Sequence, residues 1–202
     1  MKKTERILAI ITLIAIIFKL LRWPGGEILL VISLSFLSLL YYLSFALFND
    51  IRFRDVFNKS SYAGISAKRI IGAEVLGLSF SLILIGILFK AQLWPGGGIQ
   101  LGTGLFFTGI ILIVALIYNS RNKANFYKGI FRRIAIIGGF GLLIFMTSTD
   151  TIIDTYYPDQ PEYREAFKKA VANPQDQSLW DEVDRLRVER LKGELNERYN
   201  ED

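Results

Sequence analysis

Four charged residues lie in or beside long apolar runs, and in a membrane these are the side chains that could do chemistry. Lys19 and Lys90 each precede a tryptophan by four residues, at the end of an apolar run. Glu74 lies inside another run, five residues after Arg69. Charges in such positions usually face a bundle interior or a water-filled cavity. The predicted intramembrane charge site comprises Lys19, Lys90, Glu74 and, just after the first tryptophan, Glu27.

Each of these charges also has a simpler structural interpretation. The two lysines could extend their ammonium groups to the outer lipid headgroups while their methylene chains stay in the apolar layer. Glu74 could form an ion pair with Arg69 or another basic residue near the start of its run, and Glu27 could pair with Arg22 at the surface. Both kinds of interpretation remain open at the level of sequence.

Other kinds of chemistry find little support in the composition. The chain has no histidine and no cysteine, which removes the commonest general base, the commonest metal ligand and any thiol nucleophile. The apolar part contains no acidic cluster with metal-ligand spacing, no Gly-x-Ser-x-Gly turn and no phosphate-binding loop. We therefore expect a protein that is not an enzyme and that uses no cofactor or metal.

The net charge of +5 hides a segregation of charge along the chain. Residues 1–149 hold 16 Lys and Arg against 5 Asp and Glu, a net +11, whereas residues 150–202 hold 8 against 14, a net −6. The basic residues fall between apolar runs, as topology signals do. Nucleic acid is therefore not an expected partner.

A short motif that occurs twice organises the apolar part. The sequence from Phe18 to Gly26 reappears from Phe89 to Gly97, with Phe-Lys-x-x-x-Trp-Pro-Gly-Gly in common and a spacing of 71 residues. Proline and glycine favour a tight reversal, and tryptophan favours the membrane boundary. Each copy is therefore predicted to be a turn between two membrane helices, with these anchors: Trp23, Pro24, Gly25, Gly26, Trp94, Pro95, Gly96 and Gly97.

The apolar runs predict an all-α membrane protein with five transmembrane helices. They cover residues 7–21, 28–48, 70–89, 99–118 and 134–149. The first four form two hairpin repeats, A (7–48) and B (70–118), which start from the same side of the membrane and are therefore parallel. The fifth run is short, and a re-entrant segment is its alternative. The transmembrane domain is thus predicted to span residues 1–149.

The distribution of charge predicts the topology. Basic residues concentrate at the amino terminus, in residues 49–69 and in residues 119–133, which contain Arg121, Lys123, Lys128, Arg132 and Arg133. Five crossings place all these segments on the cytoplasmic side. We expect a multi-pass protein of the bacterial inner membrane, with a cytoplasmic amino terminus and a periplasmic tail.

Residues 150–202 are predicted to form an acidic helical tail in two pieces. Pro161 suits the first turn of a helix that runs to about Ala172, and Asn173-Pro174 interrupts it. Ser178, three residues before Asp181, is typical of the start of the next helix.

The repeated motif resembles the amino-terminal transmembrane hairpin of GldL, the inner-membrane motor protein of gliding motility and type IX secretion in Bacteroidota. The similarity covers residues 18–48 and 89–119. It implies that Lys19 and Lys90 correspond to the membrane lysine of that family. The family's glutamate in the second helix falls at about Tyr41 and Leu112 here, and the long cytoplasmic coiled coil is missing. The resemblance thus implies a relative of the hairpin without the proton-handling pair.

These observations predict a non-enzymatic inner-membrane subunit or scaffold of a larger complex, which the resemblance associates with a gliding or secretion motor. The expected partners are other integral membrane proteins or further copies of this chain, together with lipid. The alternative is a small transporter or ion channel that uses Glu74 with Lys19 or Lys90.

Overall fold

The computed structural model describes the backbone of residues 1–121 and 125–201 and the side chains of residues 1–120 and 127–193. Within these residues the chain is helical, without a strand. It divides into two compact units, Met1–Thr147 and Ser148–Asp202. Of the basic residues that predict the topology, Lys123 and the side chain of Arg121 lie outside the described part.

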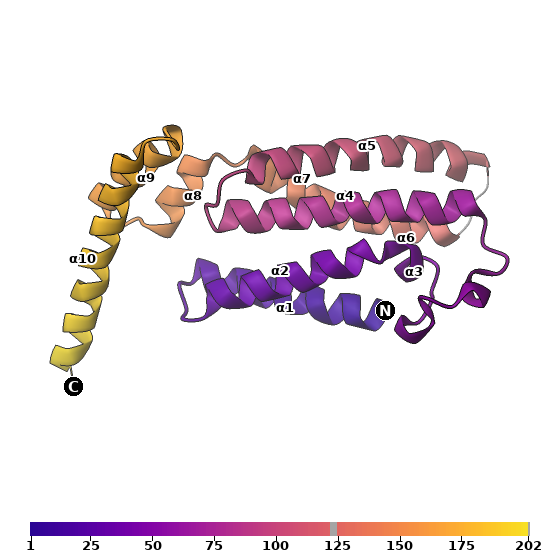
Figure 1. Cartoon of the computed structure of the whole chain (residues 1–202), viewed down its shortest axis with the longest axis horizontal. Coiled ribbons are helices and arrows are strands. Elements are labelled where there is room, and N and C mark those ends of the chain that lie inside the picture. The colour runs from indigo at the N-terminus through magenta and orange to yellow at the C-terminus, as the bar shows by residue number, and fades with distance from the viewer. Residues whose placement is uncertain (122–124, 202) are drawn as a thin grey trace. The chain divides into compact units, whose positions relative to one another are not determined.

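The first unit is a bundle built from two helical hairpins. Helices α1 (Lys2–Leu20) and α2 (Gly26–Tyr42) form the first hairpin, and α4 (Ala67–Ala91) and α5 (Gly97–Arg121) form the second. Figure 1 shows these helices side by side, with α2 packed against α4. The fold therefore contains both predicted hairpins as helical pairs.

Three helical segments in the described residues are long and apolar enough to cross a membrane: Ala67–Ala91, Gly97–Ser120 and Tyr127–Met146. α2 has only 17 residues, and α1 carries several charges among its 19. The sequence and structure thus agree on an all-helical chain in which three described segments have the length and composition of membrane-spanning helices. Five crossings remain a proposal.

The second predicted span, residues 28–48, is interrupted. α2 ends at Tyr42, and a separate short helix, α3 (Ser44–Leu47), follows. The Glu74 carboxylate accepts hydrogen bonds from the Ser44 hydroxyl (3.0 Å) and the Phe45 backbone N–H (3.3 Å). These bonds satisfy polar groups at the break, so a single helix over residues 28–48 was a wrong prediction.

Two short 3₁₀ helices, η1 (Phe53–Asp55) and η2 (Lys59–Tyr62), lie in the segment that joins the hairpins. The Tyr62 hydroxyl donates to the Val56 carbonyl (2.6 Å), and Val56 is buried with Ala46 and Ile51 in a small satellite core. The predicted polar loop is therefore folded back on itself.

The fifth apolar run belongs to a longer helical segment than the sequence indicated. It comprises α6 (Asn125–Arg133), a π-helical stretch labelled η3 (Ile134–Gly138) and α7 (Gly139–Met146). The start was predicted too late, since arginine is compatible with a helix and α6 runs through the basic residues. Tyr127–Met146 alone has 20 residues, which favours a crossing over a re-entrant segment.

The core of this unit lies between the two hairpins. Phe80, Leu76 and Ile83 on α4 are fully buried, as are Leu30 and Leu34 on α2. Gly104 of α5 lies close against the Ser79 carbonyl of α4. A Cβ at this position would come to 2.8 Å from that oxygen. The hydroxyl groups of Ser38 and Ser81 also form a hydrogen bond of 2.7 Å between α2 and α4.

The second unit contains α8 (Thr149–Tyr156), α9 (Pro161–Ala172) and α10 (Gln177–Glu201). The prediction of a helix from Pro161 to about Ala172 is confirmed. The predicted start at Ser178 was wrong: α10 begins at Gln177, and Asp176 accepts hydrogen bonds from the backbone (3.0 Å) and hydroxyl (2.6 Å) of Ser178. Asp176 fits this role because a carboxylate can accept both bonds before the first turn.

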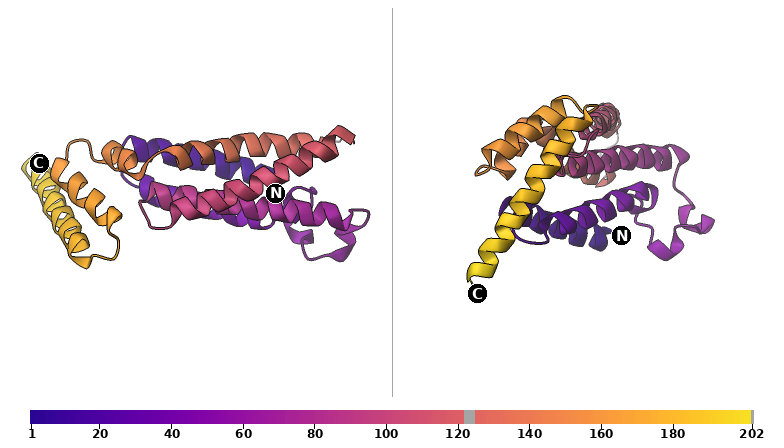
Figure 2. Two further views of the ribbon diagram at one scale, coloured as in Figure 1. Left: turned by 90° about the horizontal axis from the view of Figure 1, so that it is seen from above. Right: turned by 60° about the vertical axis from the view of Figure 1, so that its left-hand side comes forward.

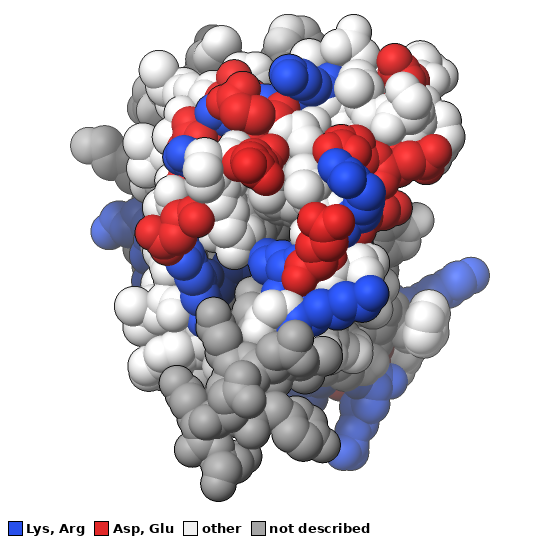
Figure 3. Space-filling view, turned by 90° about the vertical axis from the view of Figure 1, so that its left-hand side faces the viewer, with Lys and Arg blue, Asp and Glu red and all other residues white. Residues whose placement is uncertain are grey.

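The second unit has a core of its own. Tyr163 and Phe167 on α9 and Val183 on α10 are buried. The Phe167 ring lies 5.8 Å from that of Trp180 on α10, and the Tyr163 ring 4.7 Å from that of Tyr157. Figure 3 shows acidic and basic side chains interspersed over the face in view, so this unit does not present a uniformly acidic face there.

Candidate functional site

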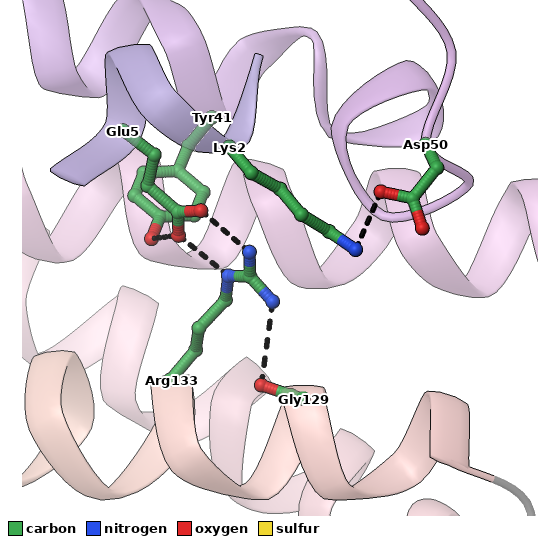
Figure 4. A network of polar contacts seen from close by, with 6 residues as sticks. All are labelled: Lys2, Glu5, Tyr41, Asp50, Gly129 and Arg133. Atoms are coloured by element: carbon green, nitrogen blue, oxygen red, sulfur yellow. Dashed lines mark hydrogen bonds and ion pairs between the residues drawn. The ribbon is translucent and has the colours of Figure 1, made fainter.

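A largely buried carboxylate, Glu5, is held by two side chains from distant parts of the chain (Figure 4). Arg133 donates from Nε to Glu5 Oε1 and from Nη2 to Glu5 Oε2, both at 2.5 Å. The Tyr41 hydroxyl donates to Oε1 at 2.6 Å. The guanidinium thus holds the carboxylate in a two-pronged arrangement, which is among the strongest of polar contacts in proteins.

Three helices supply this cluster. Glu5 lies in the first turn of α1, Tyr41 near the end of α2 and Arg133 at the end of α6. The Arg133 guanidinium also lies over the Phe48 ring, 5.0 Å from its centroid, and Arg133 Nη1 donates to the Gly129 carbonyl at 3.4 Å. The contacts therefore join α6, near the end of the first unit's sequence, to both helices of the first hairpin.

Burial makes the cluster costly to disturb. The side chains of Arg133 and Glu5 are only 10% and 13% exposed. Removing one member of a buried ion pair leaves an unpaired charge away from water, whereas replacing both members can be nearly neutral. The arrangement can act as a lock between α1, α2 and α6, because every polar group in it has a partner.

An exposed ion pair lies beside the buried cluster. Lys2 Nζ is 2.5 Å from Asp50 Oδ1, and both side chains are more than half exposed (Figure 4). This contact joins the start of α1 to the segment after α3. Exposed pairs of this kind contribute little to stability, so breaking this pair should matter less than breaking the buried one.

Sequence reasoning missed this cluster. Glu5 is the only acidic residue among the first 26, and Arg133 directly precedes an apolar run, so both had a weak local signal. Their pairing has no local signal, because 128 residues separate them. Tyr41, where the resemblance places a glutamate, here donates a hydrogen bond to a carboxylate that α1 provides.

The repeated motif forms the same helix end in both copies. In the first, the Trp23 N–H donates to the Phe18 carbonyl (2.9 Å) and the Arg22 N–H to the Lys19 carbonyl (3.1 Å). In the second copy, the Trp94 N–H donates to the Phe89 carbonyl (2.7 Å) and the Leu93 N–H to the Lys90 carbonyl (3.2 Å). This pair of bonds is the Schellman motif, which ends a helix with one residue in the left-handed conformation.

The spacing of phenylalanine and tryptophan is the same in the two copies, and the geometry of the helix end explains it. Such helix ends are stabilised by an apolar contact between the residues at the two ends of the longer bond. The Phe18 and Trp23 rings meet edge to face at 4.9 Å, and the Phe89 and Trp94 rings at 5.3 Å. The tryptophans, about half exposed, therefore close the turn as well as being available to the membrane boundary.

The glycines complete each turn. Gly25 and Gly96 have φ values of +82° and +89°, a region that glycine adopts without steric cost. Gly26 and Gly97 follow, and a Cβ on either would lie 2.8 Å from the backbone nitrogen of Lys19 or Lys90. The second glycine thus allows the two helices to meet closely at the tip.

Two of the predicted charges meet at the first tip. Lys19 Nζ lies 3.0 Å from Glu27 Oε1 and donates to Gln92 Oε1 at 3.0 Å. The Lys19 side chain is 7% exposed and the Glu27 side chain 72%. Gln92 Nε2 also donates to the Glu27 carbonyl at 3.3 Å, so these contacts join the tips of the two hairpins. Glu27 thus has Lys19 as a partner, a pairing that the sequence had not indicated.

Lys90 has a different environment from its counterpart in the first copy. Its Nζ donates to the Phe145 carbonyl at 3.0 Å, in the last turn of α7. A cation there satisfies a carbonyl that has no partner within the helix and interacts favourably with the helix dipole. Lys90 therefore fastens the end of α7 to the second hairpin.

Glu74 is far from these lysines. It lies on α4 with Lys90, 16 residues away, which corresponds to about 24 Å along a helix. Its hydrogen bonds go to Ser44 and Phe45 at the break between α2 and α3. The structure thus brings Lys19 and Glu27 together and does not bring Glu74 to Lys90.

Among the described residues, no group of three or more acidic side chains is placed to hold a metal ion. Comparisons with models of protein families, with curated proteins and with solved structures each find no match to this chain. The resemblance to the GldL hairpin therefore depends on the two copies of the motif alone.

Proposed function

We propose that this chain is a non-enzymatic subunit of a larger membrane complex, with a helical bundle in the inner membrane and a helical unit outside it that binds a partner protein. The observation that carries the proposal is the second compact unit, which has its own aromatic core beyond the last apolar helix. A folded unit with its own core can hold a fixed surface toward a partner.

The polar contacts of the bundle support a structural role. Arg133 with Glu5, Lys19 with Gln92 and Lys90 with the Phe145 carbonyl each join different helices. In each case a charged side chain of the apolar part forms a contact that joins two helices. The separation of Glu74 from Lys90, about 24 Å along α4, favours the structural role over the transporter alternative.

The second unit also offers a surface suited to a partner. Val188 and Leu191 lie three residues apart on α10 and are 48% and 45% exposed, among charged neighbours. Residues at this spacing share one face of a helix. An apolar pair framed by charges is typical of a small docking surface.

In the proposed topology the chain crosses the membrane five times, with the amino terminus in the cytoplasm and both hairpin tips and the second unit in the periplasm. The basic segments support this orientation. The absence of cysteine makes the test direct. Single cysteines at Pro24, Pro95 and Gln175 should react with a membrane-impermeant thiol reagent in intact spheroplasts, and one at Lys59 only after lysis. A different pattern would contradict the topology.

The resemblance to the GldL hairpin indicates which kind of complex to look for first. We propose that the complex is an inner-membrane motor of gliding or secretion, in which this chain has an accessory role. Tyr41 and Leu112, at the positions of the family's glutamate, make an accessory role more suitable than proton coupling.

The function is tested by purifying the tagged full-length chain in mild detergent from its own membranes. We expect a companion protein in stoichiometric amount. Val188→Asp with Leu191→Asp should release it, while the control Asp181→Ala with Glu189→Ala, exposed on the same helix, should retain it. A chain that purifies without a companion would contradict the proposal that it is a subunit of a complex. A companion that both variants retain equally would contradict the role of the α10 surface in binding it.

A further inference from the structure

A cavity of about 400 Å³ lies next to the buried cluster, between α1 and the α6–α7 segment. Figure 2 shows these two elements on the same side of the bundle. The floor is apolar and comes from both hairpins, with Leu34 and Leu37 on α2 and Leu84 and Ile87 on α4. Cavities of this size accept small molecules or part of a larger amphiphile.

The cavity opens sideways, to where the bilayer would be. Leu13 on α1 and Ile136 on η3 line it and are also 59% and 64% exposed. Its walls are therefore continuous with the outer apolar surface of the bundle. In a membrane, a hydrocarbon chain can enter such a cavity without leaving an apolar environment.

The end of the cavity near the buried cluster is basic. Lys2, Arg6, Arg132 and Arg133 line it there with Glu5. Arg133 is neutralised by Glu5 and Lys2 by Asp50. Arg6 and Arg132 are exposed, and neither takes part in an ion pair within the described residues. Arg132 interacts with Glu5 at longer range, but that carboxylate is already bonded to Arg133. Four basic side chains against the carboxylates of Glu5 and Asp50 leave this end of the cavity with a net positive charge.

We propose that this cavity binds one anionic phospholipid, with the phosphate on Arg6 and Arg132 and an acyl chain along the apolar floor. Guanidinium groups are well suited to phosphate because their N–H groups match its oxygens in pairs. In the proposed topology this end faces the cytoplasmic leaflet, where a basic pocket between helices suits an anionic headgroup. The bound lipid would fill the space between α1 and α7, and so complete the bundle.

The test uses the full-length protein in nanodiscs of equal parts phosphatidylcholine and phosphatidylglycerol. After extraction in mild detergent, retained lipid is counted by native mass spectrometry. We expect one phosphatidylglycerol per chain and no retained phosphatidylcholine. In Arg6→Gln with Arg132→Gln, retention should fall about tenfold, because two charge-assisted contacts to the phosphate are lost. Arg52→Gln with Arg54→Gln, exposed elsewhere, should leave it unchanged.

A second pair of variants tests the acyl chain. Ala9 lines the cavity, so the larger side chain in Ala9→Trp should fill it. Retention of the lipid should again fall about tenfold, because the acyl chain loses its apolar contact area in the cavity. Ala135→Trp, exposed and outside the cavity, should not. Circular dichroism and thermal unfolding verify that each variant folds.

Three results would overturn the proposal. The first is equal retention of phosphatidylcholine, which would remove the role of the anionic headgroup. The second is retention that survives loss of both arginines. The third is retention that responds to the arginines but not to Ala9→Trp, which would indicate adsorption to a charged surface instead of occupation of the cavity.

Discussion

Arg133 contacts both carboxylate oxygens of Glu5 at 2.5 Å, although 128 residues separate the two in the chain. The contact joins the first helix of the bundle to its last helical segment, and Tyr41 adds a third helix. Because both charges are largely buried, the pair has consequences for stability that an exposed pair would lack.

The first prediction concerns this pair. Arg133→Met should lower the free energy of unfolding in mild detergent by about 3–5 kcal/mol, because it leaves a buried carboxylate without its cation. Adding Glu5→Gln should recover part of the loss. Lys2→Met, which breaks the exposed pair with Asp50, should cost less than about 1 kcal/mol. If the double variant were as unstable as the sum of both single variants, the two residues would not be coupled.

The second prediction concerns the helix ends of the repeated motif. Leu93 has a φ of +58°, a conformation that costs a residue with a Cβ about 1–2 kcal/mol. Leu93→Gly should therefore raise the thermal unfolding temperature of the full chain. Leu93→Ala serves as the control, since alanine keeps the strain and should give no gain. An equal effect of both substitutions would mean that the leucine side chain, and not the backbone, decides stability here.

The third prediction concerns close packing of the second hairpin. A Cβ at Gly104 would lie 2.8 Å from both the Ser79 carbonyl and the Ile83 side chain, whereas one at Gly109 would meet nothing within 4 Å. Gly104→Ala should thus destabilise the bundle by about 1–3 kcal/mol through overpacking. Gly109→Ala, on the same helix, should be neutral or slightly stabilising. Thermal unfolding of both variants checks this, and equal stability would contradict the packing of α4 against α5.

The fourth prediction concerns the start of α10. Hydrogen bonds from the Ser178 hydroxyl and backbone lower the pKa of Asp176 below its ordinary value of 3.8. A lowered carboxylate pKa contributes stability that is present above the ordinary value and is lost as the pH falls through the folded value. The Ser178 amide should therefore exchange slowly at neutral pH and lose protection below about pH 3.8.

The matching variant for α10 is Asp176→Ala, which should remove the protection of the Ser178 amide at every pH. Gln175→Ala, at an exposed position just before it, is the control and should leave the pH dependence unchanged. Hydrogen exchange measured by mass spectrometry reads out both. Protection that persists in Asp176→Ala would assign the start of the helix to another residue.

Features that depend on near neighbours could be read from the sequence. Pro161 and the Asn173-Pro174 pair act on adjacent residues, and α9 has the predicted bounds. The Trp-Pro-Gly-Gly segments are turns between helices, because proline cannot continue a preceding helix and the left-handed Gly25 and Gly96 reverse the chain before the next one. The sequence also grouped Lys19 and Glu27 in one candidate charge site, since only eight residues separate them, but it did not indicate the contact between them.

Features that depend on how helices pack could not be read in that way. Glu74 appeared to be an isolated charge in an apolar run, yet it binds the break after α2, because α4 passes there. Lys19 and Lys90 occupy equivalent places in two copies of one motif, but one binds Gln92 and the other the end of α7. Identical local sequence gives different partners when the neighbouring helices differ.

The sequence by itself determined that this chain is helical, apolar in its first three quarters and turned twice by the same short motif. These properties follow from side-chain hydrophobicity and backbone preference over a few residues. Only the tertiary structure decided that Glu5 and Arg133 meet, and that an apolar cavity with a basic end lies beside them. The physical reason is that charge pairing and cavities depend on distances in space, which are set by helix packing across more than a hundred residues.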